Sequence, residues 1–234
     1  MQTYRTSRSR FAAVVAVLCL VMAQAASAVG GGNVIPPTAH FHGYTLTSMA
    51  HTAALFNSSG NDTTYYPTTP FQILYADFSQ AVFTFPDDGG LVVDGGNNFT
   101  ISKGTPLYVP VFSVDDSTPV LGTYPTTPTQ AVHYFFDPVQ IGGHDFQITV
   151  DGKTTPLGAE FLVGPVDTPP LLDFPEGGTA GTHTVALGVF LYPLSVGVHT
   201  VTISGEAFGD LIVGGYGLCY ERFTFTYTVQ VTPH

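Results

Sequence analysis

The side chains best suited to chemistry in this sequence are its eight histidines, because cysteine, lysine and arginine are scarce. His40 and His42 stand two positions apart, and side chains two apart in an extended segment point the same way. With His51 as a third ligand they would form a nitrogen site of the kind that binds zinc or copper. The simpler interpretation, which we favour, is a pair of exposed histidines on a flexible N-terminal segment.

The segment His40-Phe-His-Gly43 is similar to the His-x-His-Gly ligand pair of multicopper oxidases. Those enzymes need paired cysteine and histidine ligands near the C-terminus, whereas Cys219 is followed here by no histidine before His234. Cleavage after Ala39 would make His40 the N-terminal residue, as in lytic polysaccharide monooxygenases, but this position lies too far from the apolar part of the leader. A copper site at the first two histidines is therefore an alternative interpretation.

The remaining histidines have less distinctive surroundings. His183 and His199 share the parity of neighbouring apolar residues, which predicts that they lie at the rim of the core with backbone partners. His133 stands close to Asp137 and would serve as a base only if the fold aligned the two side chains.

Acidic residues offer a second metal chemistry, because carboxylates in loops bind calcium. Paired aspartates occur at positions 87–88 and 115–116, but neither pair has the spacing of an EF-hand loop, so solvated turns are the simpler interpretation. The chain also lacks a Gly-x-Ser-x-Gly elbow, a His-Glu-x-x-His motif and a phosphate-binding loop. A binding protein is thus a better expectation than an enzyme.

Two further groups of residues are candidates for contact or modification. Tyrosines in predicted loops or short strands could contact a sugar or a protein, since their rings combine an apolar face with a hydroxyl. They are Tyr65, Tyr66, Tyr124 and Tyr134. N-glycosylation sequons on predicted loops, which matter only if the source glycosylates exported proteins, begin at Asn57, Asn61 and Asn98.

The elements that position these residues begin after a predicted secretory signal peptide at residues 1–28. Three arginines precede an apolar run from Phe11 to Met22, and Ala26-Ser27-Ala28 provides the small residues of a cleavage site. The apolar run is shorter than the roughly 20 residues that a membrane-spanning helix needs. We therefore expect a secreted protein, extracellular or periplasmic, with no transmembrane segment.

The composition of the mature chain restricts its partners. Removal of the leader leaves three basic residues against 17 acidic ones, a net charge of −14, which disfavours nucleic acid as a partner. Cys219 is the one cysteine left, so no intrachain disulfide is expected. Its neighbours Leu218 and Tyr220 indicate a small buried hydrophobe.

The fold is predicted most clearly by the end of the chain. From Phe223 to Val231 apolar residues alternate strictly with threonine and glutamine, the pattern of a half-buried β-strand. Short β-type runs broken by Gly, Pro and Asp precede it, so we predict an antiparallel β-sandwich, jelly-roll or immunoglobulin-like, over residues 63–234. Residues 29–62 are expected to form a loose arm and one short helix between Thr45 and Phe56.

The strands expected in that domain are short. Pro110 indicates an edge or a bulge in one of them, because proline cannot donate to a ladder. The Asp94–Asn98 cluster is predicted to be a turn. The predicted strands are Phe71–Ala76, Ala81–Phe85, Leu91–Val93, Phe99–Ser102, Leu107–Val114, Val132–Phe136, Phe146–Val150, Glu160–Val163, Thr184–Tyr192, Val198–Ser204 and Phe223–Val231.

Four stretches of the chain have the form of recognisable turns and strands: Leu191–Gly205, Ile101–Phe112, Asp151–Lys153 and Phe223–Val231. In that order they resemble the PLSPG-x-HT turn, the IPxGTPLFxP stretch, the VDG turn and the terminal TY-x-L-TV strand of an uncharacterised family of secreted bacterial β-sandwich proteins. The similarity to bacterial immunoglobulin-like domains is weaker. The family's tryptophan-rich segment has no counterpart here, because the chain contains no tryptophan. The resemblance implies a fold and gives no mechanism.

Three hypotheses for function follow. The first is a secreted, non-enzymatic β-sandwich protein that binds a surface, a cell-envelope polymer such as a polysaccharide, or a protein through its loops or an exposed sheet face. The second is a copper- or zinc-dependent extracellular enzyme that uses His40 and His42. The third is a structural component of an envelope or matrix.

Overall fold

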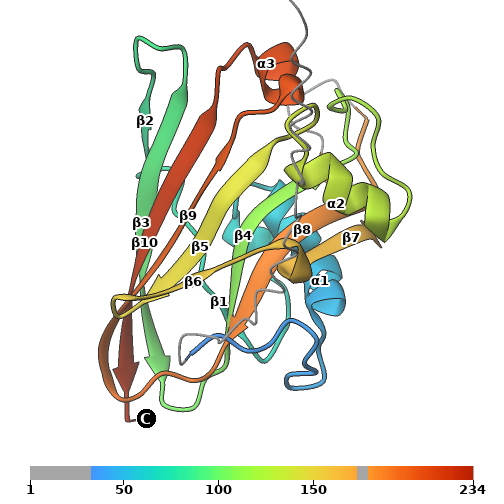
Figure 1. Ribbon diagram of the computed structural model, residues 1–234. Coiled ribbons are helices and arrows are strands. Elements are labelled where there is room, and N and C mark those ends of the chain that lie inside the picture. Colours follow the sequence, from blue (N-terminus) through green and yellow to red (C-terminus); the bar gives the residue numbers. More distant parts are fainter. Residues whose placement is uncertain (1–32, 173–178, 234) are drawn as a thin grey trace, which may run out of the picture.

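The body of the protein consists of two β-sheets packed face to face (Figure 1). The computed structural model describes residues 33–172 and 179–233, so the predicted signal peptide at residues 1–28 lies outside the described residues. The larger sheet has the strand order β2-β3-β10-β9-β5-β6 and the smaller one the order β1-β4-β8-β7. The chain therefore has the predicted two-layer, β-rich architecture.

The elements have the following bounds. The larger sheet contains β2 (Val82–Thr84), β3 (Leu91–Ser102), β10 (Glu221–Thr232), β9 (Gly197–Ala207), β5 (Gly143–Val150) and β6 (Lys153–Pro156). The smaller sheet contains β1 (Gln72–Ile73), β4 (Leu107–Asp115), β8 (His183–Leu191) and β7 (Leu162–Asp167). The helices are α1 (Leu46–Ser58), α2 (Pro128–Phe136) and α3 (Asp210–Tyr216), with short 3-10 turns at Thr63–Tyr65 and Ala159–Phe161.

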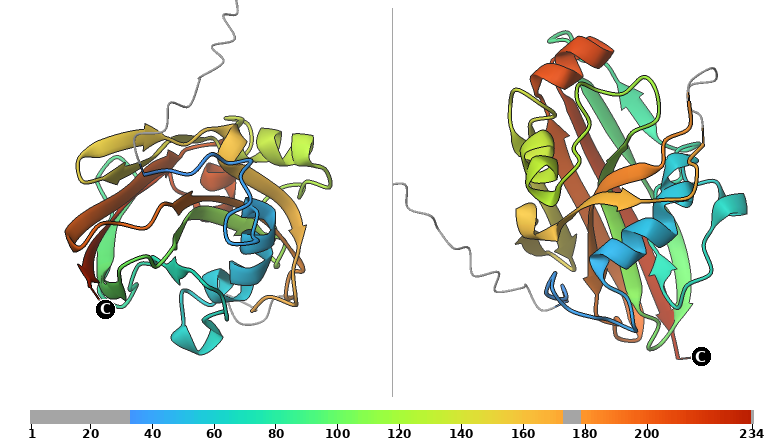
Figure 2. Two further views of the ribbon diagram at one scale, coloured as in Figure 1. Left: turned by 90° about the horizontal axis from the view of Figure 1, so that it is seen from below. Right: turned by 90° about the vertical axis from the view of Figure 1, so that its right-hand side faces the viewer.

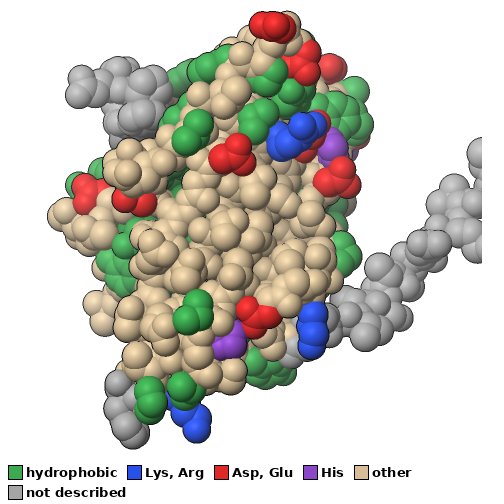
Figure 3. All heavy atoms as spheres, turned by 90° about the vertical axis from the view of Figure 1, so that its left-hand side faces the viewer, with side chains coloured by type: hydrophobic (Ala, Val, Ile, Leu, Met, Phe, Trp, Pro, Cys, Tyr) green, Lys and Arg blue, Asp and Glu red, His purple; other side chains and the backbone are tan. Residues whose placement is uncertain are grey.

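Strand β10 lies between β3 and β9 and confirms the alternation seen in the sequence. Phe223, Phe225 and Tyr227 point into the core, where each is at most 8% exposed. The residues between them point to the outside, onto a broad face of Thr, Ser, Asn and Gln side chains with few charges (Figure 3). One face of the sheet thus supplies the core and the other faces solvent.

The sheets are mixed, so the expectation of purely antiparallel pairing was wrong. β10 pairs with β9 antiparallel but with β3 parallel along its whole length, from Glu221 opposite Leu91 to Thr232 opposite Ser102. β1 also pairs with β4 in parallel. Parallel strands need a long connection between them. The connection from β3 to β10 contains most of the other elements of the domain.

The cluster Asp94–Asn98 lies inside β3 and does not form the predicted turn. A Cβ atom at Gly96 would lie 1.8 Å from the backbone oxygen of Thr226, and one at Gly95 would lie 3.3 Å from the Phe225 ring. The glycines therefore allow β3 to approach β10 and make room for an aromatic ring. Their role is close packing within a strand.

Helix α1 begins as predicted. Thr45 caps it, with its hydroxyl accepting from the Ser48 amide at 3.1 Å and the Ser48 hydroxyl accepting from the Thr45 amide at 2.8 Å. Ala50 packs against Val166 and Ala186 of the smaller sheet. The view of that side shows α1 and α2 together (Figure 2).

Helix α2 replaces the strand predicted at Val132–Phe136. Thr127 caps it and Pro128 occupies its first position, both common signals for a helix start. The buried face of the helix consists of Ala131, Tyr134 and Phe135, at helical spacing. The segment was predicted as a strand because its valine and aromatic residues are also common in strands. The described part of the chain thus has three α-helices where one was expected.

The segment before α1 is better fixed than the predicted loose arm. Val34 forms an isolated bridge with Leu191, and the Ile35 amide donates to the Phe190 carbonyl at 2.9 Å. Both side chains are at most 7% exposed. Within the described residues, no helix is both long and apolar enough to cross a membrane.

Candidate functional site

An apolar pocket of about 250 Å³ lies between the two sheets. It forms because the smaller sheet is too narrow to cover the larger one. β1 pairs with β4 at Leu107 and Tyr108, while β4 continues to Asp115 with no further described strand on that side. The facing surface of β3 and β10 is therefore covered by loop residues and short elements.

A bulge in β4 shapes the wall contributed by the smaller sheet. Pro110 pairs with Gly188 and Phe112 with Leu187, so Val111 is an extra residue on the β4 side. Pro110 has no amide hydrogen to give to the ladder, which fits the predicted bulge. Both Pro110 and Val111 line the pocket.

Aromatic rings form much of the opposite wall. Phe223 and Phe225 stack with their ring centroids 5.5 Å apart, and Phe112 stacks on Phe223 at 5.9 Å. Phe78 meets Phe225 edge to face at 5.7 Å. Offset and edge-to-face contacts are favourable arrangements for such rings, so the rings of this wall stabilise one another.

Two phenylalanines at the mouth are largely open to solvent. Phe78 is 41% exposed and Phe83, on the edge strand β2, is 51% exposed. Phe85, two residues along the chain from Phe83, is 69% exposed. An apolar rim around an apolar pocket is a feature of ligand-binding clefts.

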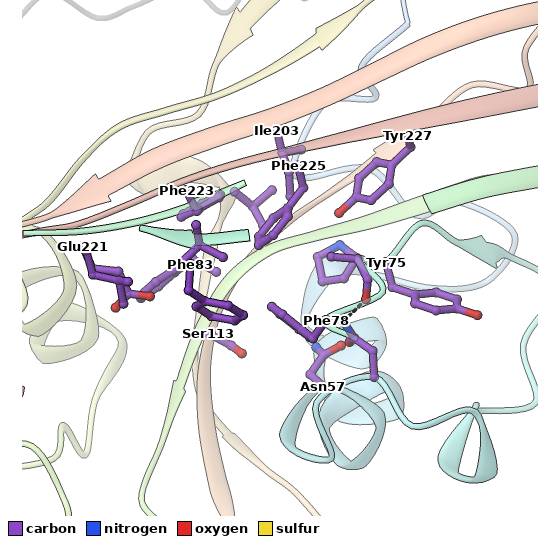
Figure 4. A pocket seen from close by; sticks show the side chains of 17 residues that line it. Asn57, Tyr75, Phe78, Phe83, Ser113, Ile203, Glu221, Phe223, Phe225 and Tyr227 are labelled. Carbon is purple, nitrogen blue, oxygen red and sulfur yellow. Dashed lines mark hydrogen bonds between the residues drawn. The ribbon is translucent and has the colours of Figure 1, made fainter. Parts of the chain in front are cut away.

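Glu221 is the charged residue of the pocket lining (Figure 4). It begins β10 on the same face as Phe223 and is half-buried. Burial raises the pKa of its carboxyl group. No described residue forms an ion pair or hydrogen bond with that carboxyl group.

Glu221 is not among the site residues predicted from the sequence, although the sequence contains a signal for it. Residues of one parity in β10 face the core, and Glu221 has the same parity as Phe223 and Phe225. Extending the alternation by two residues towards the N-terminus would have placed a carboxylate on the buried face. Phe78 and Asn57 carried no comparable signal, because the tertiary fold brings them to the pocket.

Polar atoms at the other end of the pocket come from Asn57 and Tyr227. The Asn57 Oδ1 atom is buried and has no hydrogen-bond partner among the described residues. The Tyr227 hydroxyl also forms no hydrogen bond there, and burial raises the pKa of Tyr227. In Figure 4 Glu221 and Tyr227 lie at opposite ends of the lining. The pocket thus offers an aromatic middle and polar ends.

The histidines proposed as metal ligands do not gather at one point. His40 and His42 are exposed on the segment before α1, and His42 contacts Phe41 and Phe71. His51, on α1, places Nδ1 2.5 Å from the Asp167 carbonyl oxygen. No group of three His, Cys, Asp or Glu side chains suited to a metal occurs in residues 33–172 and 179–233. Copper or zinc binding therefore stays a prediction without support from this geometry.

In each aspartate pair considered for calcium, the second residue has protein partners. Asp88 accepts from the Tyr220 hydroxyl at 3.0 Å. Asp116 accepts from the amides of Thr182 and His183 and lies 2.7 Å from His183 Nδ1. These carboxylates fasten loops to strands.

The four candidate tyrosines differ in accessibility. Tyr65 is 36% exposed, whereas Tyr134 is 3% exposed and donates to the Leu121 carbonyl at 2.8 Å. Tyr124 is half-buried and donates to the Val114 carbonyl at 3.1 Å. Tyr66 is half-buried and accepts from the Ile73 amide at 2.8 Å. Tyr65 is thus the most open of them to an external partner.

The sequon asparagines do not lie where loops were predicted, apart from Asn61. Asn57 is in the last turn of α1 and Asn98 is an exposed residue of β3. Asn61 donates from Nδ2 to the Ala76 carbonyl at 3.0 Å. Because Asn57 and Asn61 line the pocket, a glycan on either would disturb it.

Asp151, His199 and Ser195 come together in a way that resembles a catalytic triad. His199 Nδ1 is 2.6 Å from Asp151 Oδ2, and Nε2 is 3.3 Å from Ser195 Oγ. However, Nε2 is only 2.8 Å from the Ser195 backbone oxygen. A carboxylate and a carbonyl both accept hydrogen bonds, so this geometry favours protons on both ring nitrogens, whereas a general base needs a bare Nε2. The cluster is better explained as a clamp on two turns.

Cys219 is exposed, so the expectation of a buried residue was wrong. Its Sγ atom lies beside Gly89, where the chain approaches it closely, and its amide donates to the Gly89 carbonyl at 2.9 Å. The residue fixes a turn against the start of β3 through its backbone.

Neither a scan of protein-family models nor a search of curated proteins finds a match to this chain. The pocket is therefore the feature of the molecule that indicates a function.

Proposed function

We propose that this chain is an exported, non-catalytic binding protein that holds a small apolar molecule between its sheets. The observation that carries the proposal is the aromatic pocket itself, with stacked Phe223 and Phe225 on one wall and the β4 bulge on the other. Ligand sites are typically concave, mostly apolar and supplied with a few polar groups. This pocket has each of those features.

The size of the pocket favours a small ligand. An apolar cavity of about 150 Å³ takes up benzene, and the pocket here measures about 250 Å³. A compound of one or two rings fits within such a volume, and a further ring can extend past the exposed Phe78 and Phe83 at the mouth. Transfer of its apolar surface from water would drive binding.

The lining supports binding more than catalysis. It contains one carboxylate, Glu221, and none of the described lining residues is His, Cys, Lys or Arg. Acid–base or nucleophilic catalysis needs at least two cooperating groups within hydrogen-bond reach. Ser113 and Tyr227 have no such base beside them in the lining.

A fluorescent apolar probe tests this proposal. N-phenyl-1-naphthylamine, which is uncharged at neutral pH, should bind the folded protein saturably with increased emission. Val111→Phe fills the pocket and should weaken probe binding about tenfold or more, because a buried methylene group is worth about 0.8 kcal/mol and the ring displaces several atoms of ligand. Val198→Phe makes the same change at an exposed position, 66% open to solvent, and should bind as wild type does.

Circular dichroism and a melting curve show whether each variant is folded. Overpacking at Val111 is expected to cost about 1–3 kcal/mol of stability, so the comparison is made well below the melting temperature. No saturable binding by the wild type, or equal binding by Val111→Phe and Val198→Phe, would reject the proposal.

The outer face of the larger sheet gives a second candidate function, binding to a polysaccharide. Its hydroxyl and amide side chains are in register across several strands, with Thr202 opposite Thr226 and Thr149 opposite Thr202. Hydroxyl arrays of this kind can bond to sugar hydroxyls. Co-sedimentation with insoluble cellulose, chitin and peptidoglycan tests it, and wild-type retention that Thr226→Lys does not reduce would count against this face.

A further inference from the structure

Within residues 33–172 and 179–233, no cationic side chain pairs with Glu221. The neighbouring Arg222 points to the outer face, where its Nη2 and Nε atoms lie 2.6 and 2.7 Å from the Glu206 carboxylate. Lys103 and Lys153 are exposed and do not line the pocket. Among the described residues, the carboxylate at the pocket end is therefore the one charge facing an otherwise apolar space.

The position of Glu221 makes an unpaired state costly. It stands opposite Leu91 of β3 and Ala207 of β9, one step from the ring of Phe223 on the same face. A carboxylate in apolar surroundings is destabilised unless a donor or a cation reaches it. Desolvation of this group is also why the pKa of Glu221 is raised.

We infer that the pocket selects small apolar amines, with the ammonium group at Glu221 and the apolar body against Phe223 and Phe225. This inference rests on the proposed function and names its ligand class. An ammonium group brings up to three hydrogen-bond donors and the opposite charge. Aromatic rings near the carboxylate add attraction for a cation through their faces.

Charge distinguishes amines from alcohols and carboxylic acids as ligands of this pocket. An anionic ligand such as a carboxylic acid would place a second negative charge beside Glu221, in a chain with 17 acidic residues. A neutral alcohol could donate one hydrogen bond but would not gain the ionic contribution. We therefore expect the order amine, then alcohol, then carboxylate in affinity.

Three compounds of nearly equal shape provide the test. 2-Phenylethylamine, 2-phenylethanol and phenylacetate are titrated against wild-type protein at pH 7, by displacement of N-phenyl-1-naphthylamine and directly by calorimetry. The amine should bind about tenfold or more tightly than the alcohol, because only the amine adds a positive charge to its hydrogen bond with the carboxylate. Phenylacetate should bind most weakly.

Glu221→Gln keeps the shape of the side chain and removes its charge. The preference for amine over alcohol should fall to about twofold or less in this variant, while the affinity for the naphthylamine probe is kept. Glu206→Gln is the matched control, because Glu206 carries its charge on the outer face, and it should keep the full preference. Should Glu221→Gln fail to fold, the wild-type comparison of amine with alcohol still decides.

The outcomes separate the two proposals. If the probe binds and Val111→Phe blocks it, but the amine and the alcohol bind equally, the amine inference is overturned and the proposed function stands. A preference that survives in Glu221→Gln also overturns it. If neither the probe nor any phenyl compound binds the wild type, both proposals fail.

Discussion

Asp151 and His199 join two turns that are distant in sequence, with 2.6 Å between Asp151 Oδ2 and His199 Nδ1. The same carboxylate accepts from the Thr200 amide at 3.0 Å, and His199 Nε2 bonds to the Ser195 carbonyl. The pair thereby fixes the β5–β6 turn against the beginning of β9, beside the final strand.

This pair predicts a stability that depends on pH. Burial acts to lower the pKa of His199, but the bonds to Asp151 and the Ser195 carbonyl outweigh it and raise the pKa. Burial acts to raise the pKa of Asp151, but the bonds from His199 and the Thr200 amide outweigh it and lower the pKa. The charged pair is therefore favoured by folding.

The pH dependence of stability follows from the directions of the two pKa shifts. The histidine contribution is complete below its unfolded pKa of about 6.5 and is lost as pH rises through the folded value. The aspartate contribution is complete above about pH 3.9 and is lost as pH falls through the folded value. His199→Gln should lower the melting temperature most between about pH 4 and 6.5.

Melting curves from pH 4 to 9 measure this difference. Because Asp151 is well exposed, we expect only about 1–3 °C near pH 5.5 and a smaller difference at pH 9. His133→Gln is a control on the exposed side of α2, whose partner Asp137 lies on the same helix. A penalty for His199→Gln that grows steadily towards pH 9 would contradict the assignment.

Glycine packing predicts opposite effects at two positions. A Cβ atom at Gly205 would lie 2.2 Å from the Phe146 ring, whereas one at Gly214 in α3 would meet nothing within 4 Å. Gly205→Ala should therefore cost about 1–3 kcal/mol of unfolding free energy. Gly214→Ala should be neutral or stabilise by up to about 1 kcal/mol.

Urea unfolding of both variants checks this prediction. The two substitutions are the same chemically, so an equal effect in both would show that Phe146 does not pack over Gly205 as described.

The two asparagines at the pocket also predict opposite outcomes. Asn57 Oδ1 is buried without a partner among the described residues, so Asn57→Leu should leave stability unchanged or raise it by about 1 kcal/mol. Asn61 donates to Ala76 and has a φ of 66°, which asparagine tolerates better than alanine. Asn61→Ala should cost about 1–2 kcal/mol. Chemical unfolding compares them, and destabilisation by Asn57→Leu above 1 kcal/mol would be inconsistent with an unsatisfied amide.

Export predicts a defined mature terminus. If residues 1–28 are a signal peptide, the exported protein begins at Val29. N-terminal sequencing of protein recovered outside the cytoplasm measures this directly. Protein found only in the cytoplasm, with its leader intact, would remove export from the proposal and leave the pocket unaffected.

Some of these features could be predicted from the sequence because local patterns determine them. β10 follows from its alternation, and α1 follows from helical spacing after a capping threonine. The bulge at Pro110 follows from the missing amide hydrogen. In each case the residues that define the element are neighbours in sequence.

The features of the fold and the pocket that could not be predicted depend on contacts between residues distant in sequence. Gly95 and Gly96 belong to a strand because Phe225 and Thr226 lie against them, which no local pattern reveals. The residues of α2 suit either a helix or a strand, and tertiary packing decides. The pocket exists because β1 is short, and the sequence predicted a longer strand at Phe71–Ala76.

The central claim is that the space between Phe225 and the β4 bulge accepts an apolar ring. A crystal soaked with iodobenzene tests it most directly, because iodine can be located by its anomalous scattering. We predict a strong anomalous peak within the pocket, in contact with Phe225 and Val111, that is lost in Val111→Phe. A well-diffracting soaked crystal with iodine bound only at other sites would contradict the claim.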